Sequence, residues 1–483
     1  MLADQLIHLL AGVSNKDTKV LKSFINSPNS NCNSNQKKLF EALIIFHPEF
    51  NLKAIKREDI FAKVFPGQPF NYNKLANVSR GLKKVVQRFI ANQGMEEEEY
   101  AKIWFQMQYF KNQNAIDQYI TSVKQLKKIK RDPLKMKMSD HLYRWRIAND
   151  LFFNEYTKKV IPKSDTLNEL SFHFDHFFIL GKLRQASELL ARSKFLNTGN
   201  KKLFFLKEVL DHIDDNPYYQ DHLLIRFYYH LTKLQLQKDH DRFLILKKEF
   251  TQHALQLSKK DAGFILSNLI NYSYHVYHNN QGSYIQRIFE LYDFGIGIQL
   301  IPSDQVMTPS TFLNIVMVSA LTKQFDYARR FIKKFRSVVA RSDRKYVTKL
   351  SQAILYFHQQ QYEQVIEELI NFKTNNILHT FQIKNLTFRS FYVMFVNKPK
   401  EYRVFASYSL SFEAFVRQNR IVSSNRKASY LNQIKLLRKM ARYQLLGEQN
   451  EKKLMSWLKK VKSERHLNSR EWLRSELERM CKK

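Results

Sequence analysis

The sequence is poor in the residues that interrupt regular structure, because its 483 residues include only 11 glycines and 10 prolines. So few chain breakers favour long helices joined by tight turns, and they disfavour a β-sandwich or a Rossmann-like fold. Hydrophobic residues make up 44% of the chain and aromatic residues 14%, which is enough to form a folded core. We therefore predict an all-α protein.

Cysteine is also scarce, since Cys32 and Cys481 are the two cysteines and lie near opposite ends of the chain. Alone, they form neither a disulfide framework nor a cysteine-based zinc site, and this usage is typical of a reducing compartment. The first residues include the acidic Asp4 and a short apolar run, a poor match to a signal peptide. No apolar run reaches the roughly 18 residues of a membrane-spanning helix, so no membrane span is predicted and we expect a cytoplasmic protein.

Acidic residues are outnumbered, with 44 acidic against 79 basic side chains and a net charge of +35. The excess extends along the whole chain and is densest in residues 401–483, which carry 20 basic and 8 acidic side chains. A positive field attracts anionic partners, but it does not by itself define a binding site. Solvated helix faces explain the same charge without any function.

Motifs of catalysis are missing as well, since the sequence has no Walker loop and no GxGxxG, GxSxG or HExxH motif. The densest histidine cluster is SFHFDHFF, in which His173 and His176 share a helix face and Asp175 lies to the side. A metal ion would need further ligands from elsewhere, and the surrounding phenylalanines favour histidines that belong to the core. We predict no catalytic residue, no metal site and no cofactor, and hence a protein that is not an enzyme.

What the sequence does contain is a repeat, because two segments between residues 311 and 372 match at a constant offset of 37. Each predicts an apolar helix, a short polar break and a second helix whose apolar residues have helical spacing. A hairpin this short cannot bury its apolar face alone, so stacked hairpins are expected. The matching pairs are Leu313 and Leu350, Phe325 and Tyr362, Ala328 and Val365, Ile332 and Leu369, and Phe335 and Phe372.

The stretch ALTKQFDYARRFIKKF resembles the turn and second helix of a tetratricopeptide repeat. The period of 37 residues exceeds the roughly 34 of that family, and the small residues of its first helix are mostly missing. The resemblance covers residues 165–400 and implies a degenerate array of helical hairpins, a fold that binds many unrelated partners. The same pattern recurs at Leu183, Ala186 and Leu190, and more loosely at Tyr284, Leu291 and Phe294.

Residues 56–92 have the outline of a helix-turn-helix, with a short helix, a break at Phe65-Pro66-Gly67 and a long helix over 74–92. The stretch resembles the winged-helix segment of bacterial transcriptional activators that carry helical repeats, but the acidic IANQGMEEEEY that follows lacks the alternation of a wing. It is also similar to bacterial helical proteins of unknown function. A solvated face of a packed helix explains the basic residues equally well. These residues are Arg80, Lys83, Lys84 and Arg88.

A second basic region, residues 124–146, interleaves basic and aromatic side chains. Such surfaces suit RNA or single strands, because basic groups bind phosphates and rings stack on bases. Lysines that cover apolar neighbours at a helix end give the same composition without a ligand. The candidate contacts are Lys124, Lys127, Lys128, Lys130, Arg131, Arg144 and Arg146.

These patterns predict three parts, namely an N-terminal helical unit (1–95), a tetratricopeptide-like array (96–400) and C-terminal helices that cap the array (401–483). The function that we expect is a non-enzymatic scaffold that binds a protein or peptide on the repeat surface. The alternative is a nucleic-acid-binding regulator that uses the helix at 74–92, the basic patch at 124–146, or both. The identity of the partner and the oligomeric state stay open.

Overall fold

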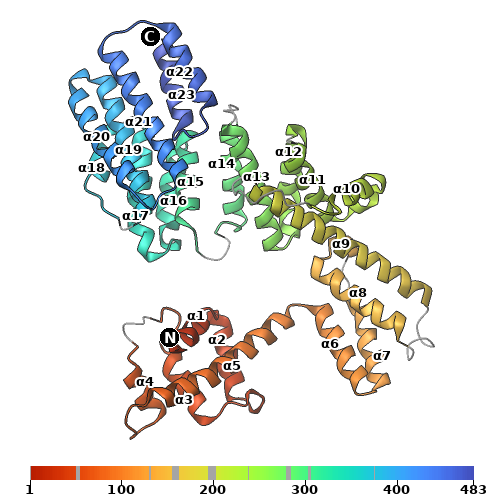
Figure 1. The fold of residues 1–483 in the computed structure, drawn as a ribbon. Helices are drawn as coiled ribbons and strands as arrows, with labels where there is room; N and C mark the ends of the chain where they lie inside the picture. Colours follow the sequence, from red (N-terminus) through yellow and green to blue (C-terminus); the bar gives the residue numbers. More distant parts are fainter. Residues whose placement is uncertain are drawn as a thin grey trace. The chain divides into compact units, whose positions relative to one another are not determined.

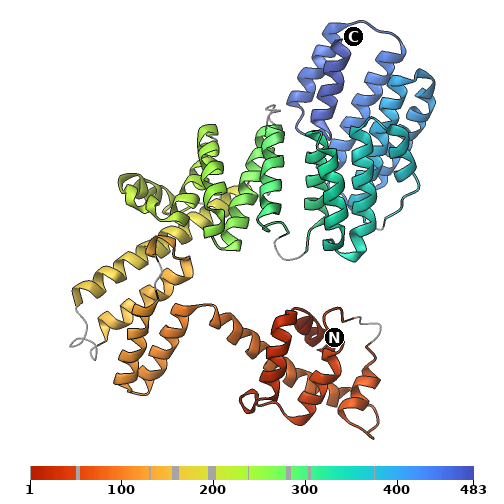
Figure 2. The same cartoon turned by 180° about the vertical axis from the view of Figure 1, so that it is seen from behind.

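The computed structural model is built from α-helices (Figures 1 and 2), and its described residues form 23 of them and no β-strand. The prediction of an all-α fold is confirmed. Within those residues, no helix combines the length and the apolar character that crossing a membrane requires. The described residues are 2–50, 55–129, 132–154, 163–193, 203–237, 239–278, 284–302, 306–374 and 376–482.

The chain divides into two compact units, unit 1 (Met1–Lys182) and unit 2 (Leu183–Lys483). The boundary falls inside a single long helix, α9 (Lys163–Ser193). The division predicted from the sequence has boundaries at residues 95 and 400, which differ from the boundary between these units. It stays a prediction.

In the first part of unit 1, the long helix α5 (Tyr72–Glu96) is the element on which the others pack. Helices α1, α2 and α3 contact it, and α4 contacts α3. Their bounds are α1 Leu2–Ala11, α2 Asn15–Asn26, α3 Ser34–Ile44 and α4 Arg57–Val64. Apolar residues three or four positions apart make one face of α5 the buried one, and they include Leu75, Leu82, Val85, Val86 and Phe89.

The second part of unit 1 has its own core, in which α6 contacts both α7 and α8. Its bounds are α6 Glu99–Asn112, α7 Ile116–Gln125 and α8 Met138–Phe153. The buried centre consists of Ile103, Met107, Tyr119 and Ile147.

Helix α9 corrects one expectation from the sequence. The pattern at Leu183, Ala186 and Leu190 predicts a hairpin turn followed by a second helix, but α9 runs without interruption from Lys163 to Ser193. The expected turn is wrong, because a straight helix and the second helix of a hairpin place apolar residues at the same spacing.

Unit 2 continues with five helices, in which α11 contacts α12 and α13, and α13 contacts α14. Their bounds are α10 Leu206–Asp215, α11 Leu223–Gln237, α12 His240–His253, α13 Lys259–His278 and α14 Tyr284–Gly297.

The two segments with matching sequences form two helical hairpins with the same turn. The hairpins consist of α15 Pro309–Leu321 and α16 Phe325–Phe335, then α17 Arg341–His358 and α18 Tyr362–Leu369. Lys323 and Gln360, which match at the offset of 37, have left-handed φ angles of 61° and 63°. The next amides, of Gln324 and Gln361, donate to carbonyls five residues back at 2.8 and 2.9 Å. A left-handed residue with this bond is a Schellman motif, which ends the first helix of each hairpin.

The last five helices of unit 2 share an aromatic core, in which α19 contacts α18, α20 and α21. Both ribbon views show them side by side (Figures 1 and 2). Their bounds are α19 Ile377–Asn397, α20 Tyr402–Gln418, α21 Ser424–Leu445, α22 Glu451–Ser463 and α23 Arg470–Cys481. The core includes Phe381, Phe388, Tyr392, Phe405, Phe412, Leu437 and Leu473.

Candidate binding groove

A groove of about 870 Å³ lies in unit 2 between α13 and the first turns of α15. One face of α13 forms a side of it, with Lys260, Gly263, Ser267 and Asn271 three or four residues apart. The described residues 299–302 and 306–308, which lie between α14 and α15, form the other side together with the beginning of α15. We call this feature the α13–α15 groove.

The floor of the α13–α15 groove is apolar and depends on one glycine. Leu266, Ile270 and Met307 are buried there. A Cβ atom on Gly295 of α14 would lie 2.6 Å from Leu266 Cδ2 and 3.0 Å from Ile301 Cδ1. Any larger residue at position 295 would therefore displace a floor residue, so the glycine allows α14 to pack closely against α13.

The rim of the α13–α15 groove is polar. Ser267, Asn271 and Asn314 are exposed, and Lys259 and Lys260 are exposed at the beginning of α13. An asparagine amide offers donors and an acceptor, which are the groups that an extended peptide backbone needs as partners. The two lysines add positive charge at one end. The arrangement can therefore hold an apolar side chain on the floor and a peptide backbone at the rim.

The beginning of α13 is held in place by a buried carboxylate. The amide of Asp261 donates to Ser258 Oγ at 3.1 Å, and the hydroxyl of Tyr228 on α11 donates to Asp261 Oδ1 at 2.8 Å. Arg184 Nη1 lies 3.7 Å from the same carboxylate oxygen. These bonds satisfy the buried charge and attach α13 to α11, which positions one side of the groove.

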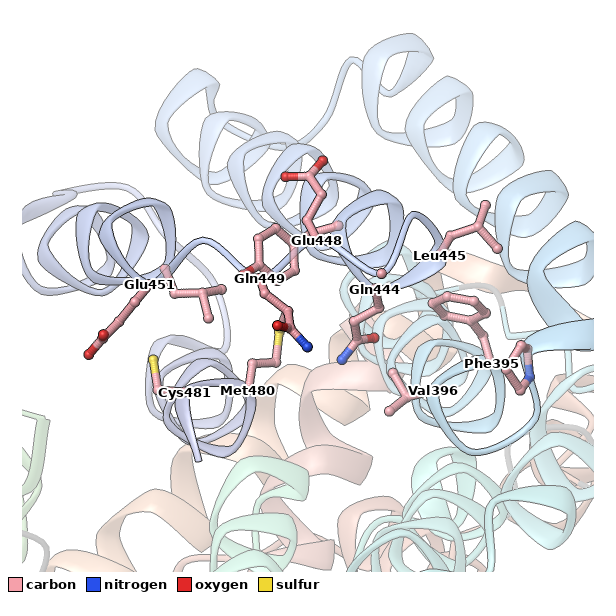
Figure 3. Close-up of a pocket in the computed structure, with 13 residues that line it drawn as sticks. Phe395, Val396, Gln444, Leu445, Glu448, Gln449, Glu451, Met480 and Cys481 are labelled. Atoms are coloured by element: carbon pink, nitrogen blue, oxygen red, sulfur yellow. The ribbon is translucent and has the colours of Figure 1, made fainter. Parts of the chain in front are cut away.

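Unit 2 has a further concavity of about 620 Å³ at the ends of α19, α21 and α23, which Figure 3 shows. Apolar, amide and acidic side chains line it. We call it the C-terminal pocket.

The four basic residues of α5 that are predicted to contact nucleic acid differ in their exposure and in their hydrogen bonds. Arg80 and Lys84 are exposed. Lys83 Nζ donates to Gln5 Oε1 at 2.9 Å. The guanidinium of Arg88 donates to the carbonyls of Asn29, at 3.2 Å, and of Ser30. Two of the four basic side chains thus bond within the N-terminal fold.

No wing follows α5. In the described residues 97–129 the chain continues as α6 and α7, with no strand where a winged-helix domain has its hairpin. The absence agrees with the acidic, non-alternating sequence there.

The predicted basic patch is spread over several elements. Lys124 and Lys128 are exposed near the end of α7. Lys130 and Arg131 lie outside the described residues, as does the side chain of Lys127.

The two arginines of the same patch, both on α8, make contacts within unit 1. The Arg146 guanidinium lies over the rings of Trp104 and Tyr143, 4.9 and 5.6 Å from their centres. Arg144 Nε donates to His173 Nε2 at 3.3 Å, and Arg144 Nη2 lies 3.1 Å from Glu169 Oε2. Arg144 is therefore partly a structural residue.

His173 and His176 are buried in unit 1 together with a third histidine, His141 of α8. The Nδ1 atoms of His141 and His173 are 3.0 Å apart, and the rings of His141 and His176 stack with centres 5.1 Å apart. Because Arg144 Nε donates to His173 Nε2, the proton of neutral His173 is on Nδ1 and is donated to His141. The described residues contain no group of three or more histidine, cysteine or acidic side chains with geometry for a metal ion.

Two of the three histidines, His173 and His176, have pKa values below the usual range. Burial and, to a lesser extent, the positive charge of Arg144 together lower the pKa of His173 to about 3. Burial also lowers the pKa of His176. Sequence reasoning missed His141, which is 32 residues from His173 and carries no pattern that links the two.

Comparisons with protein-family models, with curated proteins and with solved structures give no match to this chain. What the structure establishes is an all-helical protein of many packed helices. Its function has to be argued from its own surfaces.

Proposed function

We propose that this protein is an interaction scaffold that binds a peptide segment of a partner protein in the α13–α15 groove. The observation that carries the proposal is the combination of an apolar floor with an amide and lysine rim in a volume of about 870 Å³. Ligand sites typically have volumes of about 300–1,000 Å³ and combine apolar walls with a few convergent polar groups. Asn271 and Asn314 would bond the peptide backbone, and Lys259 and Lys260 would favour an acidic residue or a terminal carboxylate.

The same proposal includes the reading of residues 165–400 as an array of helical hairpins. Two observations support it, namely the shared turn of the hairpins α15–α16 and α17–α18 and the contact between α15 and α17. Arrays of this kind present extended surfaces for partners. A groove beside α15 fits that role.

The test is a peptide selection followed by binding measurements with matched variants. A random peptide library is displayed on phage and selected on the full chain, and selected peptides are then measured by fluorescence anisotropy. Ser267→Arg places a large side chain in the groove. Ser475→Arg on α23 is the control, because both serines are exposed and each donates to the carbonyl four residues back, that of Gly263 or Glu471.

We expect Ser267→Arg to weaken binding by tenfold or more, which is about 1.4 kcal/mol, because the larger side chain occupies space that the peptide needs, and Ser475→Arg to leave it unchanged. Lys259→Glu with Lys260→Glu should shift selection away from acidic peptides. Peptides that bind the wild type and Ser267→Arg equally would place recognition elsewhere and contradict the proposal.

Nucleic-acid binding through α5 is a second candidate, which the exposure of Arg80 and Lys84 favours. The measurement is anisotropy with generic duplex DNA and single-stranded RNA across a salt series, using the wild type and the double variant Arg80→Gln with Lys84→Gln. If α5 binds phosphates, the salt slope falls by about two in the double variant. No binding near physiological salt would exclude this candidate.

A further inference from the structure

The C-terminal pocket has walls from four helices and one loop. The end of α19 supplies Phe395 and Val396, and the end of α23 supplies Met480 and Cys481. The loop after α21 closes another side, and it turns at Gly447, whose φ of 60° is left-handed. A residue with a side chain is strained at that φ, so glycine suits this turn.

The inner wall of the C-terminal pocket is apolar. Phe395, Leu454 and Met480 are buried, and the Met480 sulfur accepts a hydrogen bond from the Tyr392 hydroxyl at 3.9 Å. This contact orients the methionine. A hydrocarbon stem of a ligand would therefore meet a preformed apolar surface.

Two amides point toward the same space. Figure 3 shows the side-chain ends of Gln444 and Gln449 directed toward one another, near Val396 and Met480. Gln444 Oε1 is buried and has no hydrogen-bond partner among the described residues. A ligand that supplied a partner would remove this penalty.

The rim charge decides which kind of partner fits. Figure 3 shows Glu451 beside Cys481 at one edge of the pocket, with its carboxylate on the side away from Gln444 and Gln449. Burial raises the pKa of the Cys481 thiol, and the negative charges of Glu451 and Glu478 raise it further. Glu448 is neutralised in part by Lys453, whose Nζ lies 2.5 Å from Glu448 Oε2. The edge is thus locally acidic in a segment with a net charge of +12.

We propose that the C-terminal pocket binds a cationic group, an amine or a guanidinium, carried on an apolar stem. The stem would pack along Phe395, Leu454 and Met480, and the cation would donate to Gln444 Oε1, while Glu451 would add negative potential from the edge of the pocket. The group could belong to a lysine or arginine side chain of a partner protein or to a small organic amine. The inference concerns a site separate from the α13–α15 groove and does not rest on the peptide proposal.

Three probes of equal length test the charge requirement, namely hexylamine, hexanol and hexanoate. Their affinities for the full chain are measured by calorimetry. Hexylamine should bind about tenfold more tightly than the other two, because a hydrogen bond to a charged group is stronger than one between neutral groups. A peptide acetyl-Leu-Lys-Leu-amide and the diamine 1,5-diaminopentane distinguish the two sources, and the tighter of the two identifies the natural class.

The position of the amine site is tested with variants and with the alkylation rate of the Cys481 thiol. Glu451→Gln and Gln444→Leu should each weaken hexylamine binding severalfold, whereas Glu367→Gln, at an exposed glutamate of α18, should not change it. In a Cys32→Ser background, hexylamine should also slow the alkylation of Cys481. If no amine binds, if hexanol binds as tightly as hexylamine, or if Glu451→Gln leaves the affinity unchanged, the proposal is overturned.

Discussion

The two units bury polar groups among aromatic rings in different ways. In unit 1, His141 and His173 are partners in a hydrogen-bonded chain that starts at Arg144. In unit 2, the Arg389 guanidinium lies between the rings of Phe357 and Trp472, with its central carbon 4.4 Å from each ring centre. Arg389 Nε is buried without a hydrogen-bond partner among the described residues.

The two units thus show two physical ways to bury a polar side chain among aromatic rings. Neutral imidazoles satisfy one another, so their stability contribution depends on their remaining uncharged. Burial lowers the pKa of Arg389 to about 10, which leaves it charged at neutral pH, and the ring faces supply the attraction that a hydrogen bond would otherwise provide. The histidine centre should therefore respond to acid, whereas the charge of Arg389 should not.

Acid is expected to have the largest effect. The folded pKa of His173 is about 3, below the usual 6.5, so between these values the unfolded chain binds a proton that the folded chain does not. Stability is fully present above pH 6.5 and is lost as the pH falls. From pH 6.5 to 4 the loss from this residue alone should be about 3 kcal/mol.

The measurement is urea unfolding at pH 7, 5.5 and 4.5, followed by tryptophan fluorescence. Trp457→Phe with Trp472→Phe leaves Trp104 and Trp145, both in unit 1, as the reporters. His230 and His358, with folded pKa values of about 4, add an acid dependence in unit 2. A unit 1 transition that keeps its stability down to pH 4.5 would contradict the prediction.

Replacing His173 by leucine should have the next largest effect. The change leaves His141 Nδ1 and Arg144 Nε without the partner that His173 provides, which should destabilise unit 1 by about 2 kcal/mol at pH 7. It also removes one titrating group, so the pH dependence between 4 and 6.5 should become less steep. The same fluorescence experiment measures both quantities, and an unchanged pH slope would show that His173 is not the group responsible.

Replacing Arg389 by lysine or by methionine should separate the effect of its charge on stability from the effect of its shape. Arg389→Lys keeps a buried charge but loses the planar group between two rings, and we expect a loss of about 1–2 kcal/mol. Arg389→Met removes the charge and its desolvation penalty, so it should be at least as stable as the lysine variant. Urea unfolding of both variants, reported by Trp457 and Trp472 after Trp104→Phe and Trp145→Phe, measures the difference. A lysine variant that is more stable than the methionine variant would mean that charge alone matters.

The smallest effect is expected at Arg144. Arg144→Gln should destabilise unit 1 by about 1 kcal/mol through loss of its bond to His173, and it should raise the pKa of His173 because a positive charge is removed. Arg146→Gln is the matched control, since Arg146 lies over rings and not beside the histidines. Equal effects of the two variants on the pH slope would contradict this assignment. Anisotropy with RNA on the same variants tests the predicted nucleic-acid contact.

Local features of the fold could be predicted well from the sequence. Ser14 followed by Asp17 predicts a helix start, and Ser14 is the N-cap of α2, accepting from the Asp17 amide at 3.1 Å. The helix expected over residues 74–92 is α5, which begins at Tyr72 and has Asn71 as its N-cap. Such signals lie within a few residues of one another, so they act wherever the segment is placed.

Sites could be predicted far less well, because their members come from distant parts of the chain. His173 and His176 were visible as a pair, but His141 was not. The α13–α15 groove depends on Gly295 lying against Leu266, and no pattern in the sequence predicts that contact. The predicted basic residues remain candidates, and Arg88 and Arg144 turn out to make bonds within the fold.

By itself, the sequence determined that this chain is helical and where helices such as α2 and α5 begin, because apolar period, caps and chain breakers act locally. Only the tertiary structure decided that α9 continues where a turn was expected, that three histidines meet, and that Arg389 lies between two rings. These outcomes depend on which helix faces pack together. The faces that pack together are those whose side chains, far apart in the sequence, fit one another. The periodicity of apolar residues within one segment does not predict that fit.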